Sequence, residues 1–207
     1  MADINKPFGR YLIKRFLGSG ATSDVFLAHD GTLGRDVALK VLKPALVSDR
    51  VSFNRFTQEA QAASKLFHDN IATVLDMGDV NGRYYISMRY VDGMSLEQLL
   101  RGKGTLTWDV VTRLIQQIGV ALEHAHSQGY LHRDIKPNNI MVSKEGNFIL
   151  TDFGLARAML ESGMTSSTGA AIGTPPYIPP EIWNGKSADP RSDEYSFACV
   201  IDEAITG

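Results

Sequence analysis

Two short polar segments carry side chains that could do chemistry together. The segment "HRDIKPNN" places Asp134, Lys136 and Asn139 between apolar stretches, and "TDFG" places Asp152 18 residues after Asp134. A carboxylate can accept a hydroxyl proton, carboxylate and amide oxygens are ligands that Mg²⁺ prefers, and an ammonium group stabilises developing negative charge. Taken separately, each residue is typical of an exposed loop; as a set, they have the parts that phosphoryl transfer needs.

A glycine-rich segment near the N-terminus supplies a second group of candidates. In "GSGATSDVF", Gly18, Gly20 and Val25 lie between two predicted strands, where glycines let backbone N–H groups approach phosphates. By itself this pattern also fits a plain hairpin turn. Lys40 in "VALK" is interpretable as a solvated strand residue, but Glu59 follows 19 residues later and could hold it against a nucleotide's phosphates.

The first half of the chain has the alternation typical of strands. Short runs rich in β-branched and bulky residues predict strands at 11–17, 25–29, 36–42, 71–78 and 83–91, the last two joined by an Asn-Gly turn. Between them, residues 52–67 change to a helical period, with an apolar face of Phe53, Phe56, Ala60, Ala63 and Phe67 and with Ser48 and Asp49 as candidate caps. This half is therefore predicted to be an antiparallel sheet with one helix.

The second half is predicted to be mainly helical, with a boundary near residues 88–93. Residues 107–129 place a broad apolar stripe on one side, and Gly129 is a plausible helix stop; the stripe comprises Val111, Leu114, Ile115, Ile118, Ala121, Leu122 and Ala125. Residues 192–207 are apolar almost all round, which is typical of a helix buried on several sides; the apolar positions are Tyr195, Phe197, Ala198, Val200, Ile201, Ala204 and Ile205.

Length and composition exclude several classes of protein. The 207 residues are 43% hydrophobic and 21% charged, which suits a folded domain rather than a disordered chain. A net charge of −2 without a basic block disfavours nucleic acid and acidic membranes as partners. The single cysteine, Cys199, the lack of a long apolar run and a polar N-terminus lead us to expect a cytoplasmic protein. A membrane anchor farther along the full-length protein is compatible with that expectation.

The ordered set "GSGATSDV", "VALK", Glu59, "HRDIKPNN", "DFG" and "GTPPYIPPE" resembles the protein kinase superfamily. The stretches "FTQEAQAASKLFHDNI" and "HAHSQGYLHRDIKPNNI" resemble bacterial, eukaryotic-like (Hanks-type) Ser/Thr kinases. The resemblance runs from about Phe8 to Gly207. It implies an α+β, bilobal fold in one kinase domain: an N-lobe of antiparallel sheet plus one helix at 8–88, a hinge at 89–92 and a mainly helical, partial C-lobe at 93–207.

The resemblance also implies a role for each matching residue. Asp134 matches the catalytic base, Lys136 and Lys40 contact phosphates, Glu59 positions Lys40, and Asn139 with Asp152 hold Mg²⁺, with Mn²⁺ as the alternative ion. Met88 matches the gatekeeper position. The implied ATP-binding residues are Leu17, Gly18, Ser19, Gly20, Val25, Ala38, Lys40, Met88, Arg89, Tyr90, Val91, Asn139, Met141 and Asp152. His132 and Phe153 match a stacked apolar spine, and Asp193 matches the residue that holds the His-Arg-Asp backbone.

The segment from Asp152 to Glu181 implies the class of substrate. "GTPPY" matches a loop that supports a peptide acceptor, and Thr174 matches a residue that accompanies Ser/Thr specificity. Ser166 and Thr168 match positions of activating phosphorylation, where a phosphate would bind Arg133. Protein substrates, activation-loop autophosphorylation and a kinase dimer for phosphorylation in trans are therefore expected.

A few positions depart from the family pattern, and other functions stay open. Ser23 occupies the third glycine position, Arg89 replaces a common acidic residue, and "PPE" stands where Ala-Pro-Glu is usual. Further C-lobe helices and an arginine partner for Glu181 are not found in this sequence, so apolar surface and that carboxylate are expected to be exposed. One alternative is a nucleotide-binding or scaffold fragment without turnover, and a weaker one is a small-molecule phosphotransferase.

Overall fold

The computed structural model of the chain describes residues 4–20, 23–44, 63–153 and 175–207, together with residues 53, 57, 60 and 61. The described chain divides into two compact units. The first comprises residues 1–65 and 73–90, and the second comprises residues 66–72 and 91–207. A division after Tyr90 falls inside the predicted hinge, but residues 66–72 group with the second unit although they lie before the predicted boundary.

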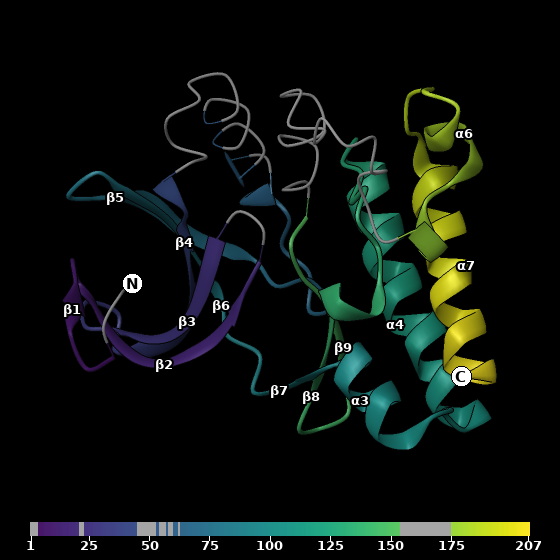
Figure 1. Ribbon diagram of the computed structural model, residues 1–207, viewed down its shortest axis with the longest axis horizontal. Helices are drawn as coiled ribbons and strands as arrows, with labels where there is room; N and C mark the ends of the chain where they lie inside the picture. The colour runs from purple at the N-terminus through teal and green to yellow at the C-terminus, as the bar shows by residue number, and fades with distance from the viewer. Residues whose placement is uncertain are drawn as a thin grey trace. The chain divides into compact units, whose positions relative to one another are not determined.

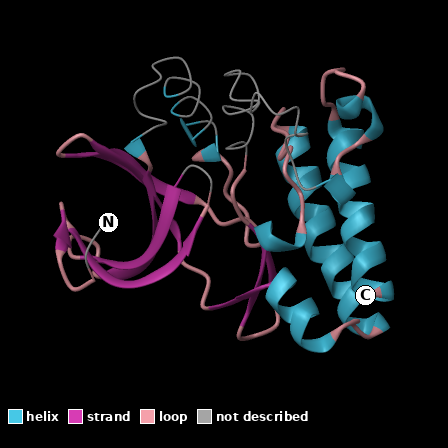
Figure 2. Ribbon diagram, in the orientation of Figure 1, coloured by secondary structure: helices cyan, strands magenta, loops and turns pink. Residues whose placement is uncertain are grey.

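The first unit is built on a curled antiparallel sheet of six strands in the order β1-β2-β3-β4-β6-β5 (Figures 1 and 2). The strands are β1 (Pro7–Phe8), β2 (Tyr11–Ser19), β3 (Ser23–Asp30), β4 (Arg35–Leu42), β5 (Val74–Val80) and β6 (Arg83–Arg89). Alternate residues such as Val37, Leu39 and Val41 are buried in its core with Tyr11 and Phe26. Burial of these branched and aromatic side chains stabilises the sheet.

The turn between β5 and β6 confirms the hairpin that the sequence predicted. Asn81 and Gly82 have φ of 53° and 76°, the left-handed pair that a two-residue turn between twisted strands requires. The helix predicted at 52–67 lies largely outside the described residues, including Ser48, Asp49 and Phe56. The placement of Phe67 on its apolar face was wrong, because Phe67 follows the helical residues and its side chain is 71% exposed.

The second unit packs helices beside a small sheet. Helices α4 (Trp108–Ser127) and α7 (Pro190–Thr206) lie side by side, with α3 (Leu96–Lys103) and α6 (Pro180–Trp183) nearby (Figure 1). The sheet has the order β7-β8-β9, formed by β7 (Gly93–Ser95), β8 (Ile140–Ser143) and β9 (Phe148–Leu150). Two single-turn 3₁₀ helices, η1 (Pro137–Asn139) and η2 (Pro175–Tyr177), complete the described elements.

The helix α4 follows the predicted stripe with one exception. Leu114, Ile118 and Leu122 are buried, whereas Ile115 is 37% exposed because it lies at the edge of the stripe. The helix ends as predicted: Gly129 has φ of 80° and its N–H donates to the carbonyl of His126, while the Tyr130 N–H donates to the carbonyl of Ala125. This paired arrangement satisfies two carbonyls at the helix end.

The helix α7 buries only part of its apolar circumference among the described residues. Phe197, Val200 and Ala204 are buried, while Tyr195 and Ile205 are 42% and 43% exposed. A capping box starts the helix, since the Asp189 side chain accepts a backbone N–H and Ser192 Oγ accepts the N–H of Asp189 at 3.1 Å. Among the described residues, one side of α7 is thus apolar and accessible.

Residues 66–72 join the second unit by backbone pairing with β9. The Leu150 N–H donates to the carbonyl of Asn70 at 2.8 Å, and the Ala72 N–H donates to the carbonyl of Leu150 at 2.9 Å. The amide of Asn70 donates to the carbonyl of Phe148 at 2.8 Å. Ile71 is buried beside them. A stretch that precedes β5 in sequence is therefore an edge partner of a strand nearly 80 residues later.

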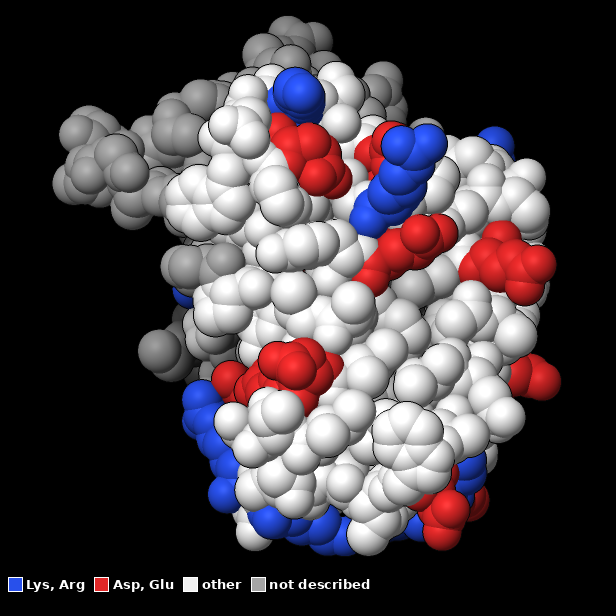
Figure 3. Space-filling view, turned by 90° about the vertical axis from the view of Figure 1, so that its right-hand side faces the viewer, with Lys and Arg blue, Asp and Glu red and all other residues white. Residues whose placement is uncertain are grey.

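The described part of the chain contains no helix both long enough and apolar enough to cross a membrane. Figure 3 shows the side of the second unit that carries α6 and α7. On that face, acidic and basic side chains are interspersed among uncharged residues.

Replacing Gly93 with alanine is expected to destabilise the protein by about 2 kcal/mol, because a methyl group there meets rigid backbone. A Cβ at Gly93 would lie 1.9 Å from the carbonyl oxygen of Val142 on the neighbouring strand. Gly102→Ala in α3 is the matched control, since a Cβ there meets nothing within 4 Å and alanine favours helix. Urea denaturation of both variants measures the difference, and an equally stable Gly93→Ala variant would contradict the close approach of β7 and β8.

Candidate active site

Asp134 lies at the centre of a compact polar cluster that spans six residues of chain. The ammonium group of Lys136 lies 2.9 Å from Asp134 Oδ1 and 2.8 Å from Oδ2. Asn139 Nδ2 donates to the Asp134 carbonyl at 2.7 Å and to Oδ2 at 2.8 Å. Pro137 starts the η1 turn that folds Asn139 back onto Asp134. The carboxylate is thus fixed in direction and remains partly accessible.

The buried imidazole of His132 supports this cluster. The N–H of Asp134 donates to His132 Nδ1 at 3.2 Å, so Nδ1 carries no proton. Its Nε2 lies 2.8 Å from the Thr151 carbonyl and must therefore donate to it. The contact expected between His132 and Phe153 is present, with the rings edge to face at 4.7 Å. The ring consequently links Asp134 to the chain just before Asp152.

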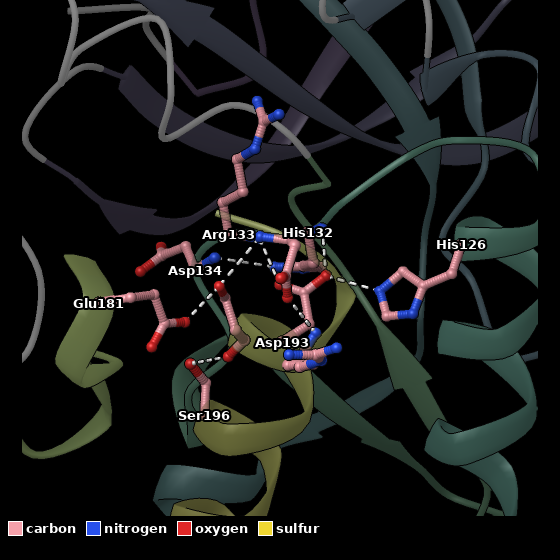
Figure 4. A network of polar contacts seen from close by, with 10 residues as sticks. His126, His132, Arg133, Asp134, Glu181, Asp193 and Ser196 are labelled. Carbon is pink, nitrogen blue, oxygen red and sulfur yellow. Dashed lines mark hydrogen bonds and ion pairs between the residues drawn. The ribbon is translucent and has the colours of Figure 1, made fainter. Parts of the chain in front are cut away.

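Asp193 of α7 holds the backbone of this loop, as the sequence resemblance implied. Its Oδ2 accepts the His132 N–H and its Oδ1 accepts the Arg133 N–H, each at 2.8 Å (Figure 4). Arg133 has φ of 66°, a left-handed conformation that costs a non-glycine residue about 1 kcal/mol. The two hydrogen bonds that these N–H groups donate to a buried carboxylate stabilise that conformation, which sets the direction of the Asp134 side chain.

His126, at the end of α4, completes the anchor and was not singled out from the sequence. Its Nε2 donates to Asp193 Oδ2 at 2.8 Å, and Figure 4 shows it approaching from the side opposite Glu181. Burial by itself would raise the pKa of Asp193, but the hydrogen bonds from His126 and from the two loop amides hold that pKa below its ordinary 3.8. The only sequence signal for the role of His126 was its position as a polar residue next to the apolar stripe of α4.

The stability that Asp193 provides is expected to decline in acid. Since its folded pKa is lower than the unfolded value of 3.8, its contribution is complete above that pH and is lost as the pH falls below it. Thermal unfolding of the wild type and of Asp193→Asn, compared from pH 7 to pH 3, measures this contribution as a difference. The gap in melting temperature should narrow below pH 4, and a gap that is constant with pH would contradict a depressed pKa.

Thr151, the residue before Asp152, connects Asp152 to the loop that carries Asp134 and Asn139. The Thr151 N–H and Oγ1 donate to the Asn139 carbonyl at 2.9 and 3.1 Å. Asp152 has φ of 64°, so the chain turns sharply directly after that anchor. In the described parts of the chain, no group of three His, Cys, Asp or Glu side chains forms a metal site. Asn139 and Asp152 together offer two oxygen-bearing side chains, which suits an ion that also binds phosphate and water.

In the first unit, the predicted nucleotide-binding residues occupy adjacent positions on neighbouring strands. Gly18 is paired with Val25, Val25 with Lys40, and Lys40 with Ile86, in one row across four strands. Ala38 is paired with Met88 in a parallel row two residues away, so Ala38 and Lys40 point to the same face. Lys40 is only 8% exposed, which argues against the solvated strand residue that was the alternative.

Other members of the predicted ATP set have identifiable neighbours. Ser19 Oγ donates to Asp24 Oδ1 at 2.7 Å at the base of the glycine-rich turn, and Leu17 precedes it on β2. The hydroxyl of Tyr90 accepts a hydrogen bond from Arg15 at 3.2 Å, and the Arg89 N–H donates to Thr73. In the second unit, Val91 and Met141 pack with Ala72 and Ile149.

Several predicted site residues fall outside the described chain, and the prediction for Glu181 was wrong. Glu59, Ser166, Thr168 and Thr174 lie outside the described residues, so their proposed roles rest on sequence. Glu181 was predicted to lack a partner, but Ser192 Oγ donates to its Oε1 at 2.5 Å. The capping turn of α7 reaches α6 and supplies that hydroxyl, in place of the arginine that pairs with this glutamate in the family.

Comparison with known sequences decides the family. The sequence model described as the protein kinase domain matches residues 11–207. The chain belongs to the protein kinase family. Members of this family use ATP with a divalent metal ion and act on protein substrates.

Curated relatives of this kinase domain are bacterial Ser/Thr kinases. It is 39% identical over 205 residues to serine/threonine-protein kinase PknD of Mycobacterium tuberculosis, covering 99% of this chain and 31% of that protein. It is 40% identical over 199 residues to PrkC of Bacillus subtilis, covering 96% of this chain and 31% of that protein. The kinase domain thus spans about a third of the length of these relatives.

Solved structures support the same fold for the kinase domain. The crystal structure of the M. tuberculosis PknI kinase domain matches with a TM-score of 0.80 and 30% identity, covering 99% of this chain and 76% of that one. A second crystal structure of that domain matches with a TM-score of 0.77 and 31% identity, covering 97% of this chain and 76% of that one. The predicted α+β kinase fold, with an antiparallel N-lobe sheet and a helical second part, is therefore confirmed.

Proposed function

We propose that this domain transfers the γ-phosphoryl group of ATP to Ser or Thr hydroxyls of proteins, with Asp134 as the base. The observation that carries the proposal is the geometry around Asp134, whose carboxylate is oriented by Lys136 and Asn139 and whose backbone is fixed by His132. Such a carboxylate is placed to accept the proton of an acceptor hydroxyl as the oxygen attacks phosphorus.

Lys136 and Lys40 would supply positive charge to the phosphates. Lys136 already contacts both oxygens of Asp134, so a phosphoryl group arriving beside that carboxylate would meet the same ammonium group. Lys40, with Glu59 as its proposed partner, would contact the nucleotide from the first unit. The shared face of Ala38, Lys40 and Met88 supports this assignment, because it combines apolar contact for a base with one cation.

Asn139 and Asp152 fit a divalent ion, which we assign as Mg²⁺ with Mn²⁺ as the alternative. Asn139 Nδ2 is used in donating to Asp134, which leaves the amide oxygen as its free ligand atom. When bound, the ion would neutralise phosphate charge. These two side chains would hold it close to Asp134, since Thr151 ties the start of the Asp152 turn to Asn139.

The proposed acceptor specificity, activation and dimerisation rest on the sequence alone. Ser/Thr specificity is assigned to Thr174, activation by autophosphorylation to Ser166 and Thr168, and phosphorylation in trans to a dimer. A cytoplasmic location is proposed on the single cysteine, Cys199, which cannot form a disulfide within this chain. A nucleotide-binding scaffold is disfavoured, because each residue implied for catalysis is present.

Intact-protein mass after incubation with ATP and Mg²⁺ tests the proposal. Increments of one phosphoryl group, mapped by peptide sequencing to Ser or Thr, are the expected result. A nucleotide that binds without any increment on the protein or on added protein acceptors would instead favour the scaffold, and transfer confined to sugars or antibiotics would favour the small-molecule phosphotransferase.

A further inference from the structure

A second lysine lies close to the glycine-rich segment. Lys43 follows Lys40 by three residues and comes directly after β4, which ends at Leu42. Its ammonium group donates to the carbonyl of Gly20 at 2.5 Å. The motif "VALK" ends at Lys40, so Lys43 was not among the predicted site residues. The contact links the end of β4 to a segment that is proposed to bind phosphate.

The register of β3 and β4 explains why Lys43 reaches this segment. Ser23, the first residue of β3, is paired with Leu42, the last residue of β4. The next side chain, that of Lys43, therefore lies beyond the paired strands and can extend toward Gly20. Lys40, inside the paired strands, is buried, whereas Lys43 is partly exposed. The two lysines thus have different surroundings, and a role for one does not imply the same role for the other.

Two further contacts hold the described part of the glycine-rich segment. The N–H of Gly20 donates to the carbonyl of Ser23 at 2.8 Å, and Ser19 Oγ donates to Asp24 Oδ1 at 2.7 Å. Both of these contacts join β2 to β3. The contact from Lys43 differs from them because it comes from a third strand and carries a positive charge. Gly20 is consequently held at its N–H and at its carbonyl.

Holding the Gly20 carbonyl fixes the orientation of a peptide group in this segment. A peptide group is planar, so a contact at its oxygen sets the direction of the whole group. Glycine has no side chain to restrict its backbone, so a glycine without such contacts samples many conformations. Backbone N–H groups bind the phosphates in segments of this kind, and their orientation determines how well they do so. The ammonium group also adds positive charge, which favours an anionic ligand.

We infer that Lys43 is a positioning residue of the nucleotide site, which holds the Gly20 peptide and thereby strengthens the binding of ATP through its phosphates. The inference rests on the proposed kinase function, because it takes the phosphates of ATP as the ligand of the glycine-rich segment. A ligand that shares the base and ribose of ATP but lacks phosphates should bind independently of Lys43. ATP and adenosine therefore form a pair of probes that separates this role from a general effect on the fold.

Dissociation constants for ATP with Mg²⁺ and for adenosine test the inference in the wild type and in Lys43→Met. Methionine is also unbranched and flexible but has neither the charge nor the donor. We expect the variant to bind ATP about fivefold more weakly, the effect of losing one charge-assisted hydrogen bond at an accessible site, while adenosine binds within about twofold of wild type. Lys43→Arg, which keeps a cationic donor, should restore ATP binding. Lys14→Met is the matched control, because Lys14 is an exposed lysine on β2 that pairs with Asp36.

Equal weakening of ATP and adenosine binding, or ATP affinity close to that of the wild type, would overturn the inference. An equal loss of ATP affinity in Lys14→Met would also overturn it, since the effect would then come from net charge. Amide exchange without nucleotide gives a second readout: the Gly20 N–H should exchange faster in Lys43→Met, while the amides of β5 keep wild-type rates. Weaker ATP binding with unchanged exchange at Gly20 would indicate direct contact with phosphate and would overturn the positioning role.

Affinity and phosphoryl transfer are separate measurements, so this inference and the proposed function fail in different ways. A wild type that binds ATP without transferring phosphate would contradict the proposed function, and the affinities would still decide the role of Lys43. Phosphoryl transfer by the wild type, with an ATP affinity that does not depend on Lys43, would support the function and overturn the inference.

Discussion

Replacing Asp134 with asparagine is expected to lower the rate of phosphoryl transfer by about 10²–10⁴-fold, the usual contribution of a general base. The asparagine amide has nearly the same shape and can still accept from Lys136 or Asn139, so the loop should keep its fold. It cannot accept the acceptor's proton. Nucleotide affinity should therefore stay close to that of the wild type.

The measurement is incorporation of phosphate into a protein acceptor under saturating ATP and Mg²⁺, with nucleotide affinity determined in parallel. Asp79→Asn is the matched control, because Asp79 is an exposed carboxylate on β5. Transfer within about threefold of wild type in Asp134→Asn would exclude Asp134 as the base. Loss of nucleotide binding together with transfer would instead show that the loop had been disrupted.

The substitution Asp193→Asn is expected to destabilise the protein by about 3 kcal/mol and to reduce activity without touching any reacting group. Three donors converge on this carboxylate: Nε2 of His126 and the backbone N–H groups of His132 and Arg133. An asparagine presents one oxygen and one NH₂, so at least one donor would face another donor. The left-handed conformation of Arg133 would lose part of its support.

Chemical denaturation measures the stability change, and kcat with KM for ATP measures the functional one. A fall in kcat at nearly constant KM is expected, since the loop that carries Asp134 is affected and the nucleotide face of the first unit is not. Asp202→Asn, an exposed carboxylate on the same helix, should change neither quantity. Stability within about 0.5 kcal/mol of wild type would contradict the anchoring role.

The parts that follow from local rules could be predicted from sequence. The Asn81-Gly82 turn needs two left-handed residues, and Gly129 needs one, so their types identify them before any tertiary contact is known. The spacing of Asp134 and Asn139 likewise determines their contact, because a short turn starting at Pro137 joins them. The apolar stripe of α4 was recognisable for the same reason, since its period is a property of the helix itself.

Features that depend on distant neighbours could not be predicted in this way. Phe67 continues the helical period of residues 53–63, but the chain leaves the helix to pair with β9, and periodicity carries no information about that partner. His126 and Ser192 are ordinary polar helix residues by type. Their importance arises only when α4, α6 and α7 come together, which also explains why Glu181 acquired an unexpected donor.

The pairing of residues 66–72 with β9 also affects how the protein folds during its synthesis. During synthesis these residues leave the ribosome well before Leu150, so their backbone groups stay solvated until β9 has emerged as well. Residues 66–72 interrupt the sequence of the first unit but belong to the second unit. A fragment ending at Tyr90 would expose Ile71 together with the unpaired edge around it. We therefore expect such a fragment to aggregate when expressed alone.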